Sequence, residues 1–423
     1  MWNLCLKLTY SRFILEICKF AMKSRFFILF TFLMLLSSNL FAAISKNEKD
    51  FIKGSLSDKI SIINKLDKKE FVPVVLKGLD FSIENVTVLE NDTQLTELAT
   101  ACVRVLPSEP EEINNIPPAD QRNISEKIMA IFKFFKDPSL RRAIMEKLEF
   151  YAGNDKELTV HFLNDYLSNA FKRNLDESKV HEGAIVTLGR IGNDESLSII
   201  YNIWVSKIWP SYQKTTDEAL VALSQDSFAN VIRIMSASSI EDSAHYFSLF
   251  YKSEKISEIF LCQVAENALL IAINNVENLS AKKGAENAFV SFLIESHEIL
   301  TEHKWSHAAP VINNAVLLAK KAYDGGTMKE KDFVRIIESS VKIPSPNLAQ
   351  SLTDMLSECN GKVEKASQGE NEMPAKSVVL ALISSLGELG DKTAFDALLY
   401  VTYLSYPLDV IDEAKKSLAA LNW

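Results

Sequence analysis

Glycine and proline are scarce in this sequence. The 423 residues include 13 glycines and 12 prolines, about 3% each, where globular proteins use roughly 7% and 5%. So few turn-forming residues argue against an all-β protein, whose many short strands need tight turns. They also argue against nucleotide-binding folds built on glycine-rich loops. We therefore expect a helical protein.

Cysteine is also scarce, and its spacing shows no pairs. Cys5 and Cys18 lie in an amino-terminal segment that we expect to be removed, which leaves Cys102, Cys262 and Cys359. An odd number without paired spacing argues against a disulfide framework. Cys102 and Cys262 occupy helical positions, where we expect small buried hydrophobic side chains.

Sequence motifs of common catalytic and cofactor sites are absent. There is no Gly-x-Ser-x-Gly, no P-loop, no Gly-x-Gly-x-x-Gly and no Cys-x-x-Cys. Acidic residues outnumber basic ones by 55 to 46, and only Arg141-Arg142 stands out as a basic pair. A nucleic-acid partner is therefore not expected. The sequence therefore predicts that the protein is not an enzyme and that it has no cofactor.

The amino terminus has the pattern of a secretory signal. Met22 opens a short cationic segment, an apolar run covers 26–36, and small residues follow up to Ser45. We expect residues 1–42 to be a signal peptide, translated from Met22 and cleaved after Ala42 or Ser45. Removing 1–42 takes away five basic residues and one acidic residue, so the remainder has a net charge of −13.

An uncleaved membrane anchor is the alternative for the same segment. Residues 26–44 approach the ~20 apolar residues that cross a bilayer, although a Ser-Ser-Asn sequence interrupts them. In that case the protein is an assembly factor held at the inner membrane. Any membrane contact would involve this segment alone.

Beyond about residue 55, apolar residues recur every three to four positions, which predicts many short helices and no strand. We expect an amino-terminal helical region over 43–106 and a connection over 107–119, whose four prolines prevent a continuous helix. Helical repeats then follow over 120–423. Within them, the polar segment 360–374 is expected to be a mobile loop.

Two segments, 183–194 and 381–392, have nearly the same pattern: Leu-Gly-x-apolar-Gly, with an aspartate close behind. Weaker copies begin near 128 and 218. Such a unit predicts a helical hairpin in which small residues let a neighbouring helix approach closely. The glycines permit a left-handed turn, and aspartate caps the returning helix. The repeat-turn residues are Gly189, Gly192, Asp194, Gly387, Gly390 and Asp391.

This pattern resembles HEAT-type repeats, most of all the short bacterial kind first described in phycobilisome lyases. The resemblance is specific over 182–204 and 378–421 and weaker over 126–150 and 216–236. It implies an all-α, HEAT/armadillo-like α-solenoid of stacked antiparallel helix pairs without a sheet, usually a protein-binding scaffold with one concave face. It also implies a bacterial protein. The lyase activity of some members does not carry over.

A histidine cluster is the one candidate metal site. His297, His303 and His307 fall within eleven residues, and His303 and His307 have the four-residue spacing that can hold zinc on one helix face. The second histidine of a His-Glu-x-x-His motif is out of place. The two interpretations are a solvated polar helix face and a metal site, which would make the protein an envelope enzyme.

Two groups of aromatic residues are candidate binding surfaces. Trp204, Trp209 and Tyr212 surround a proline at a helix junction, where we expect them to pack in the core. The second group, Tyr400, Tyr403 and Tyr406, has a spacing of three near the carboxyl terminus. These tyrosines either cap the end of the solenoid or contact a partner.

These features favour an exported, non-catalytic interaction scaffold of the bacterial periplasm or cell envelope. Its concave face would bind a partner protein, and the acidity of the chain favours a basic partner.

Overall fold

The computed structural model describes residues 45–66, 71–89, 92–152, 156–175, 177–275, 285–367 and 373–422, and its regular secondary structure in these ranges is entirely helical. The expected signal peptide and the alternative anchor lie outside the described residues. In the part of the chain that is described, no helix combines the length and the apolar character needed to span a bilayer. The predicted all-α fold is confirmed.

The helices fall into two compact units, divided after Asn154. The first unit contains α2 (Lys46–Lys53), α3 (Leu56–Asn64), α4 (Phe71–Asn85), α5 (Thr93–Val105), α6 (Pro110–Ile113), α7 (Pro118–Phe134) and α8 (Pro138–Tyr151). The proline-rich connection at 107–119 lies inside this unit. It includes the single turn of α6 and the first residues of α7.

Helices of the first unit pack in two series. One series is formed by α3, α5 and α8, and the other by α2, α4 and α7. Asp137 begins α8 as expected, because its carboxylate accepts a 2.8 Å hydrogen bond from the amide of Leu140 and Pro138 is preset for the first turn. Cys102 is buried in α5 as a free thiol.

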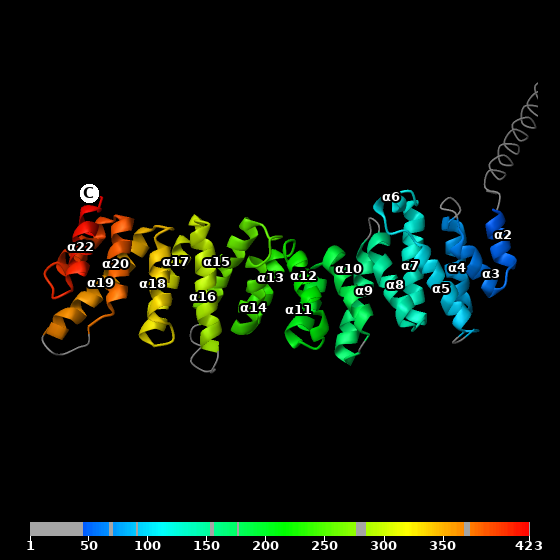
Figure 1. The fold of residues 1–423 in the computed structure, drawn as a ribbon, viewed down its shortest axis with the longest axis horizontal. Helices are drawn as coiled ribbons and strands as arrows, with labels where there is room; N and C mark the ends of the chain where they lie inside the picture. The colour runs from blue at the N-terminus through cyan, green and yellow to red at the C-terminus, as the bar shows by residue number, and fades with distance from the viewer. Residues whose placement is uncertain are drawn as a thin grey trace, which may run out of the picture. The chain divides into compact units, whose positions relative to one another are not determined.

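The second unit is the longer one and is an α-solenoid (Figure 1). Its helices are α9 (Glu157–Arg173), α10 (Ser178–Ile191), α11 (Asp194–Ser206), α12 (Gln213–Ser224), α13 (Phe228–Ala237), α14 (Ile240–Tyr251), α15 (Glu258–Asn274), α16 (Ala285–Glu302), α17 (Ala309–Asp324), α18 (Glu330–Ser340), α19 (Pro346–Ser367), α20 (Lys376–Leu389), α21 (Phe395–Val401) and α22 (Leu408–Ala419). Short 3₁₀ turns η1 (Pro210–Tyr212), η3 (Ser306–Ala308) and η4 (Lys392–Ala394) precede α12, α17 and α21.

Helices of the second unit alternate between two layers. The even-numbered helices α10 to α22 contact one another in series, and the odd-numbered helices α9 to α21 do the same. Each odd helix also contacts the even helix that follows it. A helix pair cannot bury its apolar face alone, so stacking of successive pairs produces the continuous core.

Gly189 and Gly387 lie inside α10 and α20, so their expected place in the turns is wrong, but they allow the close approach between even helices that the small residues of the repeat predict. A Cβ atom on Gly189 of α10 would lie 3.0 Å from the Cβ of Ala219 in α12. A Cβ on Gly387 of α20 would lie 2.8 Å from the Cβ of Ser417 in α22. A Cβ atom at either position would crowd the neighbouring helix at these separations.

The turns after the two repeat helices differ from each other. Gly390 has a φ of 65° and ends α20 in the left-handed conformation, and Asp391 caps η4 by accepting from Thr393. Gly192 has a φ of −68°, so the expected left-handed turn is wrong there. A Cβ on Gly192 would instead lie 2.4 Å from the carbonyl oxygen of Leu188, so this position excludes a side chain for a steric reason.

The expected cap at Asp194 is also wrong. Asn193 is the residue that caps α11, accepting from the amides of Glu195 and Ser196, and Asp194 is the first helical residue. Asparagine and aspartate are similarly good caps, so the choice between adjacent residues depends on where the backbone turns.

The expected mobile loop at 360–374 is partly helical. Residues 360–367 continue α19, a helix of 22 residues. Asn360 is buried and donates to the carbonyl of Ala397 on α21. Polar composition suggested a loop, but the neighbouring helix satisfies this amide.

Candidate functional site

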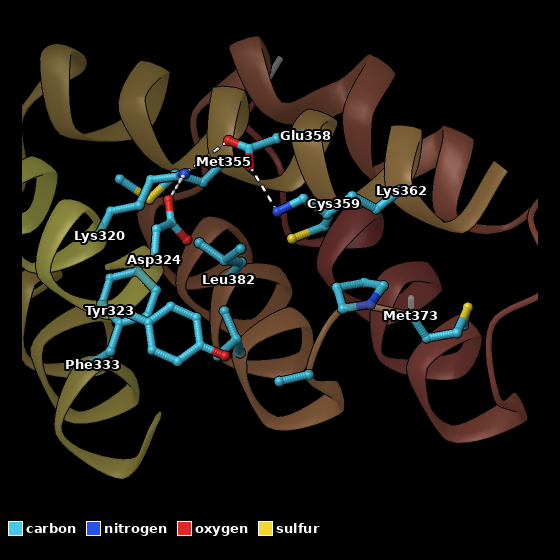
Figure 2. A pocket seen from close by; sticks show the side chains of 13 residues that line it. Lys320, Tyr323, Asp324, Phe333, Met355, Glu358, Cys359, Lys362, Met373 and Leu382 are labelled. Carbon is cyan, nitrogen blue, oxygen red and sulfur yellow. Dashed lines mark hydrogen bonds and ion pairs between the residues drawn. The ribbon is translucent and has the colours of Figure 1, made fainter. Parts of the chain in front are cut away.

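A groove of about 520 Å³ lies among α17, α18, α19 and α20 of the second unit (Figure 2). The last two turns of α17 form one wall, and the middle of α19 forms another. Residues 373–375 and the first turns of α20 complete the groove. Its lining residues are Lys320, Tyr323, Asp324, Phe333, Met355, Glu358, Cys359, Lys362, Met373, Pro374, Ala375, Val378 and Leu382.

The end of α17 determines the position of the first wall. Gly325 closes the helix, and Gly326 has a φ of 74°, which favours glycine. The amides of Thr327 and Met328 both donate to the carbonyl of Ala322, which holds the turn tightly against the helix end. The side chains of the last turn, Tyr323 and Asp324, therefore lie at the groove.

The floor of the groove is apolar. Phe333, Met355, Val378 and Leu382 are largely buried. The Tyr323 ring stacks on Phe333, with centroids 5.0 Å apart and planes at 18°. Met373, by contrast, is 50% exposed at the rim. The floor is thus formed by apolar side chains that their neighbours largely cover, and Met373 is an exposed apolar side chain at the rim.

A row of alternating charges forms the rim. Lys320 Nζ lies 2.6 Å from Asp324 Oδ2 and 2.8 Å from Glu358 Oε2. Lys362 Nζ lies 2.9 Å from the other oxygen of Glu358, Oε1. Figure 2 shows Lys320 between the two carboxylates, with Lys362 beyond Glu358. The four side chains are therefore paired with one another.

These contacts favour the ionised forms of Glu358, Lys362 and Lys320. Hydrogen bonds from Lys320 and Lys362 lower the pKa of Glu358. The hydrogen bond to Glu358 raises the pKa of Lys362. Burial lowers the pKa of Lys320, but its hydrogen bonds to Asp324 and Glu358 outweigh that effect and the pKa is raised.

Cys359 lies in the wall of the groove as a free thiol. Burial raises its pKa to about 11, so the thiol stays protonated at neutral pH. The thiolate is the nucleophilic and metal-binding form of cysteine. The geometry of the groove therefore provides binding contacts: an apolar floor, an aromatic wall and a paired charged rim.

The structure separates the two candidate zinc histidines. Helix α16 ends at Glu302, and Lys304 has a φ of 50°, so the chain reverses between His303 and His307. His303 Nδ1 lies 2.9 Å from Glu258 Oε1, whereas His307 lies in η3. The expected shared helix face is therefore wrong. Across the described ranges, no group of three or more histidine, cysteine, aspartate or glutamate side chains is placed to hold a metal ion.

His297 is buried rather than solvated. It is 0% exposed, and its Nδ1 lies 3.3 Å from Ser339 Oγ. Burial, followed by the charge of Lys342, lowers its pKa to about 3. The interpretation of this segment as a solvated helix face is wrong for His297, because that side of α16 packs against α18.

The three tyrosines near the carboxyl terminus face different surroundings. Tyr403 is 76% exposed and Tyr400 is 41% exposed, but Tyr406 is 7% exposed. The hydroxyl of Tyr406 donates a 3.0 Å hydrogen bond to Asn360 Oδ1. Tyr406 belongs to the core, and partner contact at Tyr400 and Tyr403 stays a prediction.

The aromatic residues around the α11–α12 junction are core residues, as expected. Trp204, Trp209 and Tyr212 are all buried. The indole of Trp204 donates to Asp217 Oδ1 at 2.6 Å, and the ring of Trp209 stacks on His181 at 4.2 Å. The contacts of these three aromatic residues connect neighbouring helices, and their buried side chains present no exposed binding surface.

Sequence reasoning did not identify the groove. The two ion pairs within helices, Lys320 with Asp324 and Glu358 with Lys362, have the four-residue spacing of a helix face and were visible as such. The contact between Lys320 and Glu358 joins α17 to α19, and no local sequence pattern predicts it.

No family model matches the chain, and no curated protein matches it. Three solved chains match. One is described as a circular tandem repeat protein with novel repeat topology and enhanced subunit contact surfaces. It is 11% identical, and the match covers 86% of this chain and 75% of that chain with a TM-score of 0.16. A likeness at that level carries no argument about function.

Proposed function

We propose that this protein is a HEAT-like interaction scaffold, exported to the bacterial periplasm or cell envelope, and that it binds a partner protein without catalysing a reaction. The groove among α17–α20 receives part of that partner. The observation that carries the proposal is a groove of about 520 Å³ over buried apolar side chains, under a rim whose charges are already paired.

The groove has features of a protein-binding pocket rather than of packing between repeats. Anchor side chains that dominate protein interfaces insert into preformed, desolvated pockets surrounded by polar groups. Stacked rings at Tyr323 and Phe333 give such an anchor a rigid wall. Because the rim charges are already paired, an anchor side chain of the partner can enter the groove without leaving any of them buried and unpaired.

Export is the part of the proposal that depends on sequence alone. The cationic segment at Met22 and the apolar run over 26–36 support it. Mass spectrometry of the native amino terminus tests it. A chain that starts near residue 43 or 46 supports cleavage and export, whereas a chain that retains 26–44 favours a membrane-anchored assembly factor.

Affinity capture with two matched tryptophan variants tests the binding proposal. Ala375→Trp places a large ring at the groove rim, and Ser291→Trp places one on an exposed position of α16. We expect the wild-type chain and Ser291→Trp to retain the same envelope proteins and Ala375→Trp to lose them. If all three retain the same proteins, or if none retains any, the groove is not a partner site.

A further inference from the structure

Helix α22 has a side that no helix of the described chain covers. Each even helix from α12 to α20 packs against an even helix on both sides, whereas the described helices that α22 packs against are α20 and α21. Asp409 and Ser417 mark the side of α22 that faces α20, because Asp409 pairs with Lys376 and Ser417 lies against Gly387. The opposite side is where the next helix of an even series would lie.

An apolar stripe runs along that opposite side. Its members follow one another at spacings of three and four, which places them on one face of the helix: Leu408, Ile411, Lys415 and Leu418. At about 3.6 residues per turn, this face points away from Asp409 and Ser417. Leu408 is 78% exposed, and Ile411 and Leu418 are half-buried. The stripe therefore offers a second helix an apolar contact with one lysine in its middle.

The charges of α22 are divided between its two halves. The acidic side chains Asp409, Asp412 and Glu413 come first, and Lys415 and Lys416 follow. Lys415 Nζ lies 3.3 Å from Asp412 Oδ1, and both side chains are more than 60% exposed. Exposed pairs of this kind contribute little, so their members are free to exchange partners. Two antiparallel copies of α22 would thus place the acidic half of each beside the basic half of the other.

We propose that a second copy of this chain covers the stripe, with the two α22 helices antiparallel about a twofold axis. Leu408 of each copy lies against Leu418 of the other, and Asp412 lies against Lys415, because both pairs are centred near Glu413. A twofold interface makes each of these contacts twice. The second α22 takes the place that the next even helix takes inside the unit. This inference does not depend on the function proposed for the groove.

A second copy fits the stripe better than helices of other character. A basic helix would face Lys415 with a like charge, and an acidic helix would face Asp412 in the same way. A purely apolar helix would desolvate both charges without supplying an opposite one. The antiparallel copy supplies one opposite charge for each, and Leu408 and Leu418 supply the apolar contact on either side of them.

Sedimentation equilibrium of the purified chain tests the inference. We expect the mass of two chains at micromolar concentration. Leu408→Glu places a carboxylate against a leucine at two points of the dimer, and it should weaken association by about a hundredfold. Ile259→Glu is the matched control, because Ile259 is 62% exposed on α15. This variant should keep the mass of two chains.

Charge reversal tests the antiparallel geometry. Asp412→Lys alone sets two lysines together across the axis, and Lys415→Asp alone sets two aspartates together, so each should weaken association about tenfold. An equimolar mixture of the two single variants should associate as the wild type does, because both contacts between the copies then join opposite charges. The pair within each helix remains broken in that mixture, so fraying of α22 cannot produce the recovery.

Three results would overturn the inference. The wild-type chain could sediment with the mass of one chain at micromolar concentration. Ile259→Glu could weaken association as much as Leu408→Glu does. The mixture of Asp412→Lys and Lys415→Asp could associate no better than either variant alone.

Discussion

Gly387 and Gly361 both lie inside helices of the second unit, but only Gly387 faces a neighbouring helix. A Cβ atom on Gly387 would lie 2.5 Å from Ser417 Oγ, 2.8 Å from its Cβ and 3.0 Å from its Cα. A Cβ on Gly361 in α19 would meet nothing within 4 Å. The same substitution, glycine to alanine, should therefore have opposite effects at the two positions.

The expected magnitudes come from two opposing contributions. Alanine stabilises a helix interior by about 0.8–1 kcal/mol relative to glycine, and Gly361→Ala should gain most of that. Gly387→Ala gains the same helix propensity but must separate α20 from α22, and overpacking of this kind costs about 1–3 kcal/mol. We expect Gly387→Ala to be destabilising by about 1 kcal/mol, so that the two variants differ by roughly 2 kcal/mol.

Native-state hydrogen exchange read by mass spectrometry is the suitable assay. A chain with two units need not unfold in a single transition, whereas exchange reports the opening of each helix separately. We expect faster exchange in α20 and α22 of Gly387→Ala and slower exchange in α19 of Gly361→Ala. Adding Ser417→Gly to Gly387→Ala removes two of the three close contacts, so the two substitutions should couple favourably.

A Gly387→Ala variant that exchanges as slowly as the wild type in α20 and α22 would refute this reasoning. It would mean that the two helices separate without loss, and that the glycine at this repeat position is not required by their close approach.

Three further predictions concern single side chains. Because burial lowers the pKa of His297 to about 3, the unfolded chain binds a proton below about pH 6.5 that the folded chain does not. The free energy of unfolding should then fall between about pH 6.5 and 3 by up to about 1.4 kcal/mol per pH unit, and His297→Gln should remove that slope from acid-unfolding curves. Tyr406→Phe leaves the Oδ1 of buried Asn360 without its 3.0 Å hydrogen bond, so thermal unfolding should show a loss of about 1–3 kcal/mol, whereas Tyr403→Phe should show none. Asp137→Ala removes the cap of α8 and should lower the urea midpoint by an amount equivalent to about 1 kcal/mol.

Sequence periodicity was sufficient for the fold class because each helix pair repeats the same local rules. Apolar residues at a spacing of three to four, Asp137 before Pro138, and Gly325-Gly326 all produce the expected helices and ends. A close approach between repeat helices was also predicted, although the structure places it at Gly189 and Gly387, which were expected in the turns.

Local sequence rules gave wrong predictions where contacts distant in sequence, or the exact position of a turn, decide the structure. Asn193 and Asp194 are both good caps, and the backbone turn selects Asn193. The segment that begins at Asn360 is polar enough for a loop, but it continues α19, and the side-chain amide of Asn360 donates to the carbonyl of Ala397. His303 and His307 have helical spacing, but the helix ends before either of them.

The sequence by itself determined that this protein is helical and built from stacked helical hairpins, because helix periodicity and turn glycines act over a few residues. Only the tertiary structure decided where a binding surface lies. The groove joins Lys320 of α17, Glu358 of α19 and Val378 of α20. These residues come together because α17 packs against α19 within the odd layer, and α19 packs against α20 of the even layer. The ionisation of Glu358 and the neutrality of His297 likewise depend on neighbours distant in sequence. Burial and charge pairing are properties of the assembled layers, and no local stretch of residues contains them.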